Sequence, residues 1–267
     1  MKSVNSSGNA RYKSLRRLIE SSQERKRTGL SVLDGAHLVA AYLAHAGRPE
    51  QVAISRSGAA NPEIRALLAR MERTEVIALG DALFKSLSPV VTPTGILALV
   101  RTPRELPVPQ DMDACVMLED LQDPGNLGSI LRTCAAAGMK HVLLSRGSVH
   151  AWSPRVLRAA MGAHFALGIH EQADLRDVAR VFPGRLIATR QRAPQTVFDL
   201  DLKGKVALLF GNEGAGLSAG LQQAAHAVVS IPMAGKAESL NVAAAAAVCL
   251  FERVRQLRVT ADEAACS

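Results

Sequence analysis

The sequence predicts an α/β protein built from two domains. Strand-like and helix-like segments alternate along most of its 267 residues, a pattern typical of a mainly parallel sheet with helices on both sides. The hydrophobic content of 48% is enough to bury a sizeable core in each domain. Three prolines in Thr102–Asp111 prevent a central strand or helix there. We therefore predict domains over residues 1–105 and 113–267, joined by a proline-rich linker at 106–112.

The first domain is predicted to begin with a basic helix over residues 11–28, in which Leu15, Leu18 and Ile19 share one face. A short strand over residues 29–34 and a helix over residues 35–46, closed by Gly47, follow. The remaining segments complete a small α/β unit, with strands at 51–55, 75–78 and 95–100 and helices at 62–71 and 81–87.

The second domain opens with Ala114–Leu118, a run apolar enough to be a strand covered on both faces. A loop over residues 123–129 leads into a helix that runs through Arg132 to Ala137, which Gly138 is expected to stop. Further segments continue the alternation, with strands at 141–145, 185–189 and 206–210 and helices at 154–164 and 174–182.

The last strand, Ala227–Ile231, ends at Pro232 and is followed by a glycine-containing loop and an alanine-rich helix. Ser239 stands where a residue capping that helix is expected, and a plain capped helix packed into a core is the alternative to a binding loop. Ligands of parallel sheets bind at the carboxyl ends of strands, where the glycine-bearing loops of this domain are expected.

Two common nucleotide-binding patterns do not fit these loops. The glycines of Gly211–Gly216 are spaced G-x-x-G-x-G, which is not the dinucleotide fingerprint, and Gly235-Lys236 lacks the upstream glycine of a P-loop.

Positive charge is concentrated at the start of the chain. The formal net charge is +8, and the first thirty residues hold eight lysines and arginines against Glu20 and Glu24. A polyanion is the natural partner of such a patch, and a merely solvated basic helix is the alternative. If nucleic acid binds there, the candidate contacts are Lys13, Arg16, Arg17, Arg25, Lys26 and Arg27.

The remaining composition argues against metal and membrane proteins. The four cysteines form no C-x-x-C pair and the seven histidines show no ligand spacing, so we expect buried free thiols, a reducing compartment and no zinc. No apolar run approaches the roughly 20 residues that cross a bilayer, and no secretion signal is visible. We expect no membrane partner and a cytoplasmic location.

Three segments of the second domain carry the most specific pattern in the chain. They are Asn126-x-Gly128-x-x-x-Arg132-Thr, Phe210-Gly-Asn-Glu213-Gly-x-Gly216 and Ile231-Pro-Met-x-Gly235-x-x-x-Ser239-Leu-Asn241-Val-Ala. In order and spacing they resemble the three motifs of the SpoU/TrmH family of RNA 2′-O-ribose methyltransferases. Through Asp34-Gly-Ala-His-Leu-Val and Thr92-Pro-Thr-Gly-Ile-Leu-Ala, the first domain more loosely resembles the ribosomal-protein-L30-like (L30e-like) substrate-binding domain of many members.

The resemblance implies a C-terminal SPOUT domain in which the chain threads a loop to form a deep trefoil knot. It also implies S-adenosylmethionine as the methyl donor and a homodimer whose active sites include residues of both subunits. By the matching positions, the donor would be contacted by Gly211, Ile231 and Leu240, with Thr189 from the preceding strand. The catalytic group would consist of Asn126, Arg132, Glu213, Ser239 and Asn241.

The chemistry of ribose methylation suits these residue types. A ribose hydroxyl is a poor nucleophile, so the protein must align the reacting atoms and help the proton leave, and no metal is needed. In the family the arginine at the Arg132 position is proposed as the base, yet a guanidinium stays protonated far above neutral pH. Whether Arg132 accepts the proton or stabilises the oxyanion through phosphate stays open. We expect Glu213 to hold that guanidinium.

These considerations predict an RNA ribose 2′-O-methyltransferase that acts on ribosomal RNA, 23S in particular. An L30e-like domain suits recognition of a folded RNA loop by its shape, which favours ribosomal over transfer RNA. A transfer RNA 2′-O-methyltransferase and a noncatalytic RNA-binding ribosome-assembly factor are the alternatives, and the intact catalytic group argues against the latter. The modified nucleotide, and a housekeeping or antibiotic-resistance role, cannot be deduced from the sequence.

Overall fold

The computed structural model describes residues 2–88, 92–104 and 107–265, and the chain divides into two compact units. The first unit contains Met1–Arg104 and His150–Phe165, and the second contains Glu105–Val149 and Ala166–Ser267. The first division lies between Arg104 and Glu105, within the proline-containing run Thr102–Asp111 but just before the predicted linker at 106–112, and Glu105 and Leu106 lie outside the described residues. Residues 150–165 pack with the first unit although their place in the sequence is inside the predicted second domain. Independent folding of the two predicted domains stays a prediction.

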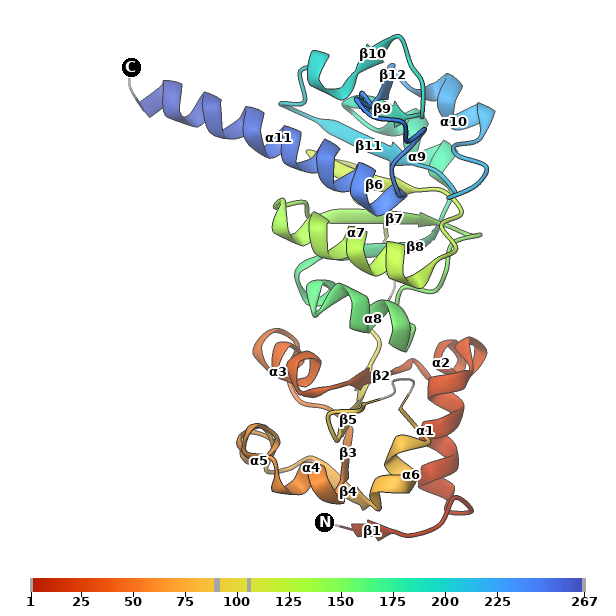
Figure 1. The fold of residues 1–267 in the computed structure, drawn as a ribbon, viewed down its shortest axis with the longest axis vertical. Coiled ribbons are helices and arrows are strands. Elements are labelled where there is room, and N and C mark those ends of the chain that lie inside the picture. Colours follow the sequence, from red (N-terminus) through yellow and green to blue (C-terminus); the bar gives the residue numbers. More distant parts are fainter. Residues whose placement is uncertain (1, 89–91, 105–106, 266–267) are drawn as a thin grey trace. The chain divides into compact units, whose positions relative to one another are not determined.

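The first unit is built on a mixed five-stranded sheet with the strand order β1-β4-β3-β5-β2 (Figure 1). Its strands are β1 (Lys2–Val4), β2 (Leu30–Asp34), β3 (Gln51–Ser55), β4 (Glu75–Leu79) and β5 (Ile96–Arg101). Strands β1, β4 and β3 run parallel, and β5 is antiparallel to both β3 and β2. The helices of this unit after the basic segment are α3 (Ala36–His45), α4 (Arg56–Ala60), α5 (Pro62–Ala69), α6 (Asp81–Lys85) and α8 (Pro154–Ala160).

The basic segment forms two helices, α1 (Ala10–Glu20) and α2 (Ser22–Thr28), so the single helix predicted over 11–28 is wrong. Ser21 interrupts it in an extended conformation, with φ −114° and ψ 116°, and its hydroxyl accepts a hydrogen bond from the Glu24 N–H at 3.2 Å. Serine is a favoured N-cap, whereas the apolar spacing on which the prediction rested runs on through the break. Leu15 and Leu18 are buried as expected.

The second unit is built on a seven-stranded sheet whose described pairings are all parallel, which confirms the predicted α/β fold class with a mainly parallel sheet. The strand order is β10-β12-β9-β11-β6-β7-β8. The strands are β6 (Ala114–Leu118), β7 (His141–Ser145), β8 (Gly168–Ala173), β9 (Arg185–Thr189), β10 (Gln195–Thr196), β11 (Val206–Phe210) and β12 (Ala227–Ser230).

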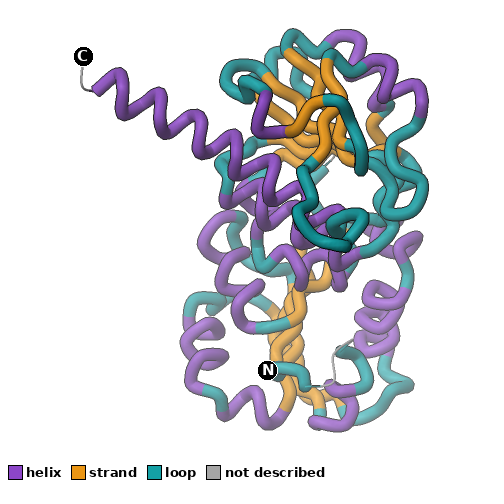
Figure 2. The backbone as a smooth tube through the Cα atoms, turned by 45° about the horizontal axis from the view of Figure 1, so that its top comes forward, coloured by secondary structure: helices purple, strands orange, loops and turns teal. Residues whose placement is uncertain are grey.

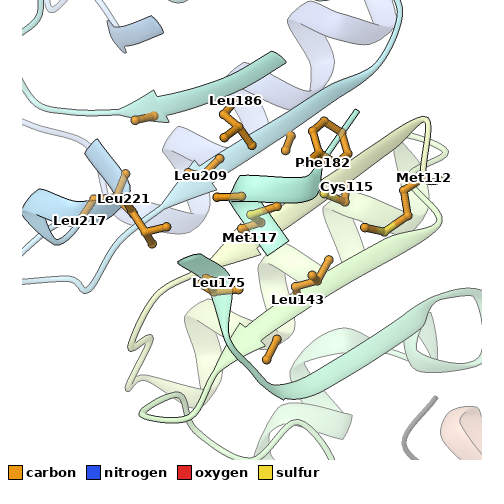
Figure 3. Close-up of a cluster of buried hydrophobic side chains, with 14 residues drawn as sticks. Met112, Cys115, Met117, Leu143, Leu175, Phe182, Leu186, Leu209, Leu217 and Leu221 are labelled. Carbon is orange, nitrogen blue, oxygen red and sulfur yellow. The ribbon is translucent and has the colours of Figure 1, made fainter. Parts of the chain in front are cut away.

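Helices cover both faces of this sheet. On one face, α9 (Leu175–Val181) and α10 (Ala219–Ala224) enclose a cluster of buried side chains from five strands (Figure 3). On the other, α7 (Pro124–Ala136) and the long α11 (Val242–Ala265) pack against each other, and α11 also contacts β11. The far end of α11 projects beyond the sheet, as Figures 1 and 2 both show. Side chains alternate between the faces of a strand, so central strands covered on both sides read as continuous apolar runs.

Several short elements between residues 163 and 224 were not predicted. They are β8, β10, α10 and the 3₁₀ turns η1 (Ala163–Ala166) and η2 (Val197–Asp199). The predicted helix over 154–164 ends earlier, because Met161 adopts a left-handed conformation with φ 51°. Residues 163–166 then form η1.

Candidate active site

Four neighbouring strands of the second unit deliver their following loops to one edge of the sheet. Strands β12, β9, β11 and β6 are adjacent and parallel, so their carboxyl ends meet at the same edge. The segments that leave this edge contain the three motifs singled out in the sequence. Segments far apart in the chain are therefore brought together by the sheet itself.

The first motif lies on a helix and not on a loop. Helix α7 begins at Pro124, directly after Asp123, whose side chain accepts a hydrogen bond from the Asn126 N–H at 2.7 Å. An aspartate at the N-cap followed by proline at the first helical position is a strong start signal, and the helix therefore includes residues 124–129, which were predicted to be a loop. Asn126 consequently projects from the first turn of α7.

The second motif forms a tight loop after β11. The backbones of Asn212 and Gly216 exchange hydrogen bonds at 3.1 and 2.9 Å, and the Asn212 side chain accepts from the N–H groups of Gly214 and Ala215 at 2.9 and 3.0 Å. A Cβ added to Gly211 would collide with the backbone of Gly216 and Leu217. Only glycine therefore lets the loop close on itself at this point.

Glu213, at the tip of this loop, binds the start of α7. Its carboxylate accepts from the N–H groups of Gln122 and Asp123 at 3.2 and 3.0 Å and from Asn126 Nδ2 at 3.1 Å. Burial raises the pKa of Glu213, but these hydrogen bonds outweigh burial and the pKa is lowered, so the carboxylate is ionised at neutral pH. Glu213 makes no hydrogen bond or ion pair with Arg132 within the described residues, so the expectation that Glu213 holds this guanidinium stays a prediction.

The third motif joins the same network through Asn241. Its Nδ2 donates to Asn126 Oδ1 at 2.9 Å, and its Oδ1 accepts from the Ala243 N–H at 2.9 Å. Asn241 is therefore the N-cap of α11, and the assignment of that role to Ser239 is wrong. An ionised carboxylate only accepts, so Glu213 fixes the orientation of the Asn126 amide, which in turn fixes that of Asn241.

A pocket of about 640 Å³ opens beside this network. Its lining includes all four residues expected to contact the donor (Thr189, Gly211, Ile231 and Leu240) and also Glu213, Ser239 and Asn241. The volume lies within the range of small-molecule sites. Thr189 also supports the pocket wall, since its hydroxyl donates to the Leu209 carbonyl at 2.9 Å.

Arg132 stands apart from the other catalytic candidates. It is exposed on α7, does not line the pocket, and forms no hydrogen bond or ion pair within residues 2–88, 92–104 and 107–265. On α7 it belongs to an exposed stripe with Gly125, Ser129 and Ala136, spaced as neighbours on one helix face.

The six basic candidates of the first unit divide into two kinds. Arg25 is buried, with 5% of its surface exposed, and donates to the carbonyls of Leu18 and Ile19 at 2.7 and 3.1 Å. It therefore satisfies the end of α1 and is not available to a ligand. The exposed candidates are Lys13, Arg16, Arg17, Lys26 and Arg27.

For thiols, metal sites and membrane helices, the structural findings cover the described residues only. Cys115, Cys134 and Cys249 are buried and free, and burial raises the pKa of each to about 12, whereas Cys266 lies outside the described part. In that described part, no group of three or more His, Cys, Asp or Glu side chains is placed to hold a metal ion. None of its helices is both long and apolar enough to cross a membrane.

Some functional positions were missed in the sequence. Asp123 caps α7, Asn212 shapes the second loop, and Arg190 and Arg192 line the pocket. The Asp-Pro pair was a usable signal for the first. The two arginines lie outside all three motifs, and only the sheet order brings them to the site.

Comparisons with known proteins identify the family to which both units are similar. A model of the SpoU rRNA methylase family matches residues 113–251, and a model of an MRM3-like substrate binding domain matches residues 9–98. A tRNA/rRNA methyltransferase of Synechocystis sp., itself named as uncharacterized, is 34% identical, over 95% of this chain and 94% of its own length. The 23S rRNA (guanosine(2553)-2′-O)-methyltransferase RlmP of Bacillus subtilis is 28% identical, over 94% and 98%. The solved SpoU methyltransferase AviRb of Streptomyces viridochromogenes, in complex with AdoMet, superposes with a TM-score of 0.82 and 30% identity, over 93% of this chain and 98% of that one.

Proposed function

The chain belongs to the SpoU rRNA methylase family, and from this membership and its site we propose that it methylates the ribose 2′-hydroxyl of a nucleotide in ribosomal RNA, 23S in particular. S-adenosylmethionine is the methyl donor. The observation that carries the proposal is the hydrogen-bonded series Glu213–Asn126–Asn241, which joins all three motifs beside one pocket.

The residues of the pocket fit the methyl donor. S-adenosylmethionine supplies a methyl group already activated by a sulfonium sulfur. Apolar side chains such as Ile231 and Leu240 offer a surface for its adenine, and the backbone of the two loops offers hydrogen bonds. The tight closure at Gly211 keeps the wall free of side-chain bulk. No metal ion is part of the proposal.

The chain's own part in catalysis is alignment and charge stabilisation. Asn126 and Asn241 are held in fixed orientations, so their amides provide neutral, preorganised hydrogen bonds at the acceptor side of the pocket. Ser239 adds a hydroxyl on the pocket wall. Arg132 is proposed to orient the phosphate next to the reacting hydroxyl and to stabilise the charge left when its proton departs.

A homodimer is proposed because Arg132 lies outside the pocket of its own subunit. Its exposed stripe on α7 consists otherwise of small residues, and the adjacent α11 exposes Ala244 and Phe251, the latter with 49% of its surface accessible. Small residues permit close helix packing, and an exposed phenylalanine on such a face favours association. In a symmetric dimer these stripes would face their copies and carry Arg132 toward the partner's pocket.

Substrate RNA is proposed to contact the exposed basic residues of α1 and α2 (Lys13, Arg16, Arg17, Lys26 and Arg27). They lie within the segment that matches an MRM3-like substrate binding domain. Arg16 and Arg27 already pair with Glu20 and Glu24 at 2.8 and 2.7 Å, so part of their charge is compensated. A cytoplasmic location is proposed as well, in keeping with a ribosomal RNA substrate.

The proposal is tested by incubating the protein with labelled S-adenosylmethionine and unmodified ribosomal RNA, then mapping alkali-resistant linkages. Wild type is expected to label one or a few riboses of 23S RNA, and Arg132→Ala to lose about 100-fold or more in rate. Arg180→Gln, which removes an exposed arginine outside the pocket, is the matched control and should retain full activity. Transfer by Arg132→Ala at the wild-type rate, or labelling of transfer RNA alone, would contradict the assignment; RNA binding without any transfer would favour an assembly factor.

A further inference from the structure

The pocket has a basic side that the motifs do not account for. Arg190 and Arg192 line it from the short segment between β9 and β10 and are both exposed. They lie outside the three motifs and were not among the site residues predicted from the sequence.

The backbone fixes where this segment runs. Thr189, the last residue of β9, and Gln195, the first of β10, both align with Val229 of β12, which lies between the two strands. Residues 190–194 must therefore cross β12 at the level where that strand is about to end and pass into the loop of the third motif. The Arg190 N–H donates to the Val229 carbonyl at 2.9 Å, and this bond holds the start of the crossing in place.

The far end of the segment is held equally well. Thr196 and Asp199 form a capping box, in which the carboxylate accepts from the Thr196 N–H at 2.9 Å and from its hydroxyl at 2.8 Å. Five residues anchored at both ends have limited freedom, so the two guanidinium groups are kept beside the pocket and do not belong to a long open loop.

The two charges are uncompensated within the described residues. Neither Arg190 nor Arg192 forms an ion pair or a side-chain hydrogen bond there. The carboxylates on the lining are those of Glu213, which is committed to the start of α7, and Glu238, which pairs with neither arginine in that part of the chain. Guanidinium groups stay charged at neutral pH, and two of them beside a concavity raise its positive potential.

We propose that Arg190 and Arg192 bind a backbone phosphate of the substrate RNA next to the target ribose and so position the 2′-hydroxyl over the methyl donor. This inference rests on the proposed function, which makes RNA the ligand that enters this pocket. The planar fork of arginine matches phosphate oxygens with two parallel hydrogen bonds. A cationic sulfonium gains nothing from these charges, whereas a phosphodiester that reaches the exposed side of the pocket does.

The assignment adds a second phosphate contact to that of Arg132. The two contacts come from different elements, α7 and the β9–β10 segment, so together they would fix the RNA backbone on both sides of one nucleotide. Arg190 and Arg192 are positioning residues in this scheme, since they act on the reacting oxygen only through the phosphate that they hold.

The test compares Arg190→Gln/Arg192→Gln with a control that removes the same charge elsewhere, Arg180→Gln/Lys203→Gln; these two side chains are exposed and outside the pocket. Binding of unmodified 23S RNA transcript is measured across a range of salt concentrations, and S-adenosylmethionine affinity is measured by calorimetry. We expect the pocket variant to bind RNA about 10-fold more weakly and to lose roughly 1 to 2 from the slope of log K against log salt. Donor affinity should stay unchanged, KM for RNA should rise, and kcat at saturating RNA should fall as well, because the 2′-hydroxyl is then less well aligned with the donor.

Unchanged RNA affinity and salt slope in the pocket variant would overturn the proposal. A fall in donor affinity would also overturn it, because it would assign the arginines to the carboxylate of S-adenosylmethionine. If the double variant unfolds, Arg192→Gln is compared with Lys203→Gln instead. RNA affinity across the salt range and S-adenosylmethionine affinity are measured for both single variants. RNA binding is read without methyl transfer, so a wild type that binds through these arginines but transfers no label would refute the proposed reaction and not this contact.

Discussion

Single amides determine how the site is held together. Asn126 donates to Glu213 and accepts from Asn241, so one side chain joins segments that lie 87 and 115 positions away in the chain. The amide is suited to this position because it both donates and accepts, whereas a carboxylate or a hydrocarbon would break one contact or both.

Asn126→Asp tests this network directly. The new carboxylate would face Glu213 without a donor between them, and like charges at hydrogen-bond distance repel. We expect methyl transfer to fall by about 100-fold, since small misplacements of catalytic groups cost that much. Rates are compared with those of Asn61→Asp, which should match wild type because Asn61 only accepts from the Glu63 N–H. A fully active Asn126→Asp enzyme would show that the network is dispensable.

His164 makes the first unit sensitive to acid. It is buried, with 3% exposure, its Nε2 donates to the Ala151 carbonyl at 2.8 Å, and its ring packs on Trp152. Burial lowers the pKa of His164 to about 4, with the Ala151 hydrogen bond acting in the opposite direction. Its pKa is 6.5 when unfolded. The unfolded chain therefore takes up a proton that the folded chain refuses between these values, and stability falls as the pH drops from 6.5 toward 4.

The contribution of His164 amounts to at most about 3 kcal/mol across that window. Urea unfolding at pH 7 and pH 5 should show a loss of stability in wild type that is smaller in His164→Gln, which cannot be protonated. Burial also lowers the pKa of His150, to about 4, so the His164→Gln variant should keep part of the loss of stability in acid. Equal losses in the two proteins would mean that His164 is not the group responsible.

At the scale of elements, the parallel sheet was the most predictable part. The bounds of β3, β7, β9 and β11 were predicted correctly because each is a short apolar run ended by a turn signal. β8, Gly168–Ala173, was missed because it is an edge strand whose His170, Glu171 and Gln172 do not form an apolar pattern. Strand propensity and hydrophobic spacing are weak guides wherever only one side of a strand is paired.

The candidate site was predictable in its members but not in their contacts. Most of the predicted residues meet at one edge because parallel strands end together. The partner of Glu213 was not predictable, because nothing in the sequence shows that the loop after β11 lies against the start of α7. Spacing likewise gave no sign that Arg132 would be exposed on α7 and absent from the pocket lining.

Adding a single methyl group at Gly211 tests whether the donor pocket depends on the tight closure of the loop after β11. Gly211→Ala would force a Cβ into the backbone of Gly216 and Leu217, and such overpacking costs about 1–3 kcal/mol. We expect a lower melting temperature and a weaker S-adenosylmethionine affinity by calorimetry. Gly214→Ala is the control, because its Cβ would lie at an ordinary 3.6 Å from Asn212 Oδ1. A Gly211→Ala protein that binds the donor as well as wild type would exclude tight closure as the reason for glycine.

The whole molecule agrees with the fold class that the motifs implied, and its likeness to solved members of the family confirms that class. The further question at this scale is how many subunits form one active site. Exposed stripes on α7 and α11 support an answer of two, with Arg132 supplied by the partner.

Mixed dimers distinguish the two answers. Arg132→Ala and Gly211→Val subunits are each expected to be inactive alone, the first for want of the guanidinium and the second for want of a pocket. If Arg132 acts across the interface, a dimer of one of each contains one intact site and recovers about half the wild-type rate. If it acts within its own subunit, the mixture stays inactive. Copurification on two different tags, followed by the labelled transfer assay, supplies the measurement.

The position of the α11 N-cap late in the sequence determines when the site can form during synthesis of the chain. Asn241 is translated after Asn126 and Glu213, and it adds the third member of their hydrogen-bonded series and opens the helix that packs on α7. A nascent chain that ends before Asn241 lacks part of the lining of the donor pocket, and it also lacks the side chain that donates to Asn126. Methyl transfer should therefore depend on synthesis of nearly the whole second unit.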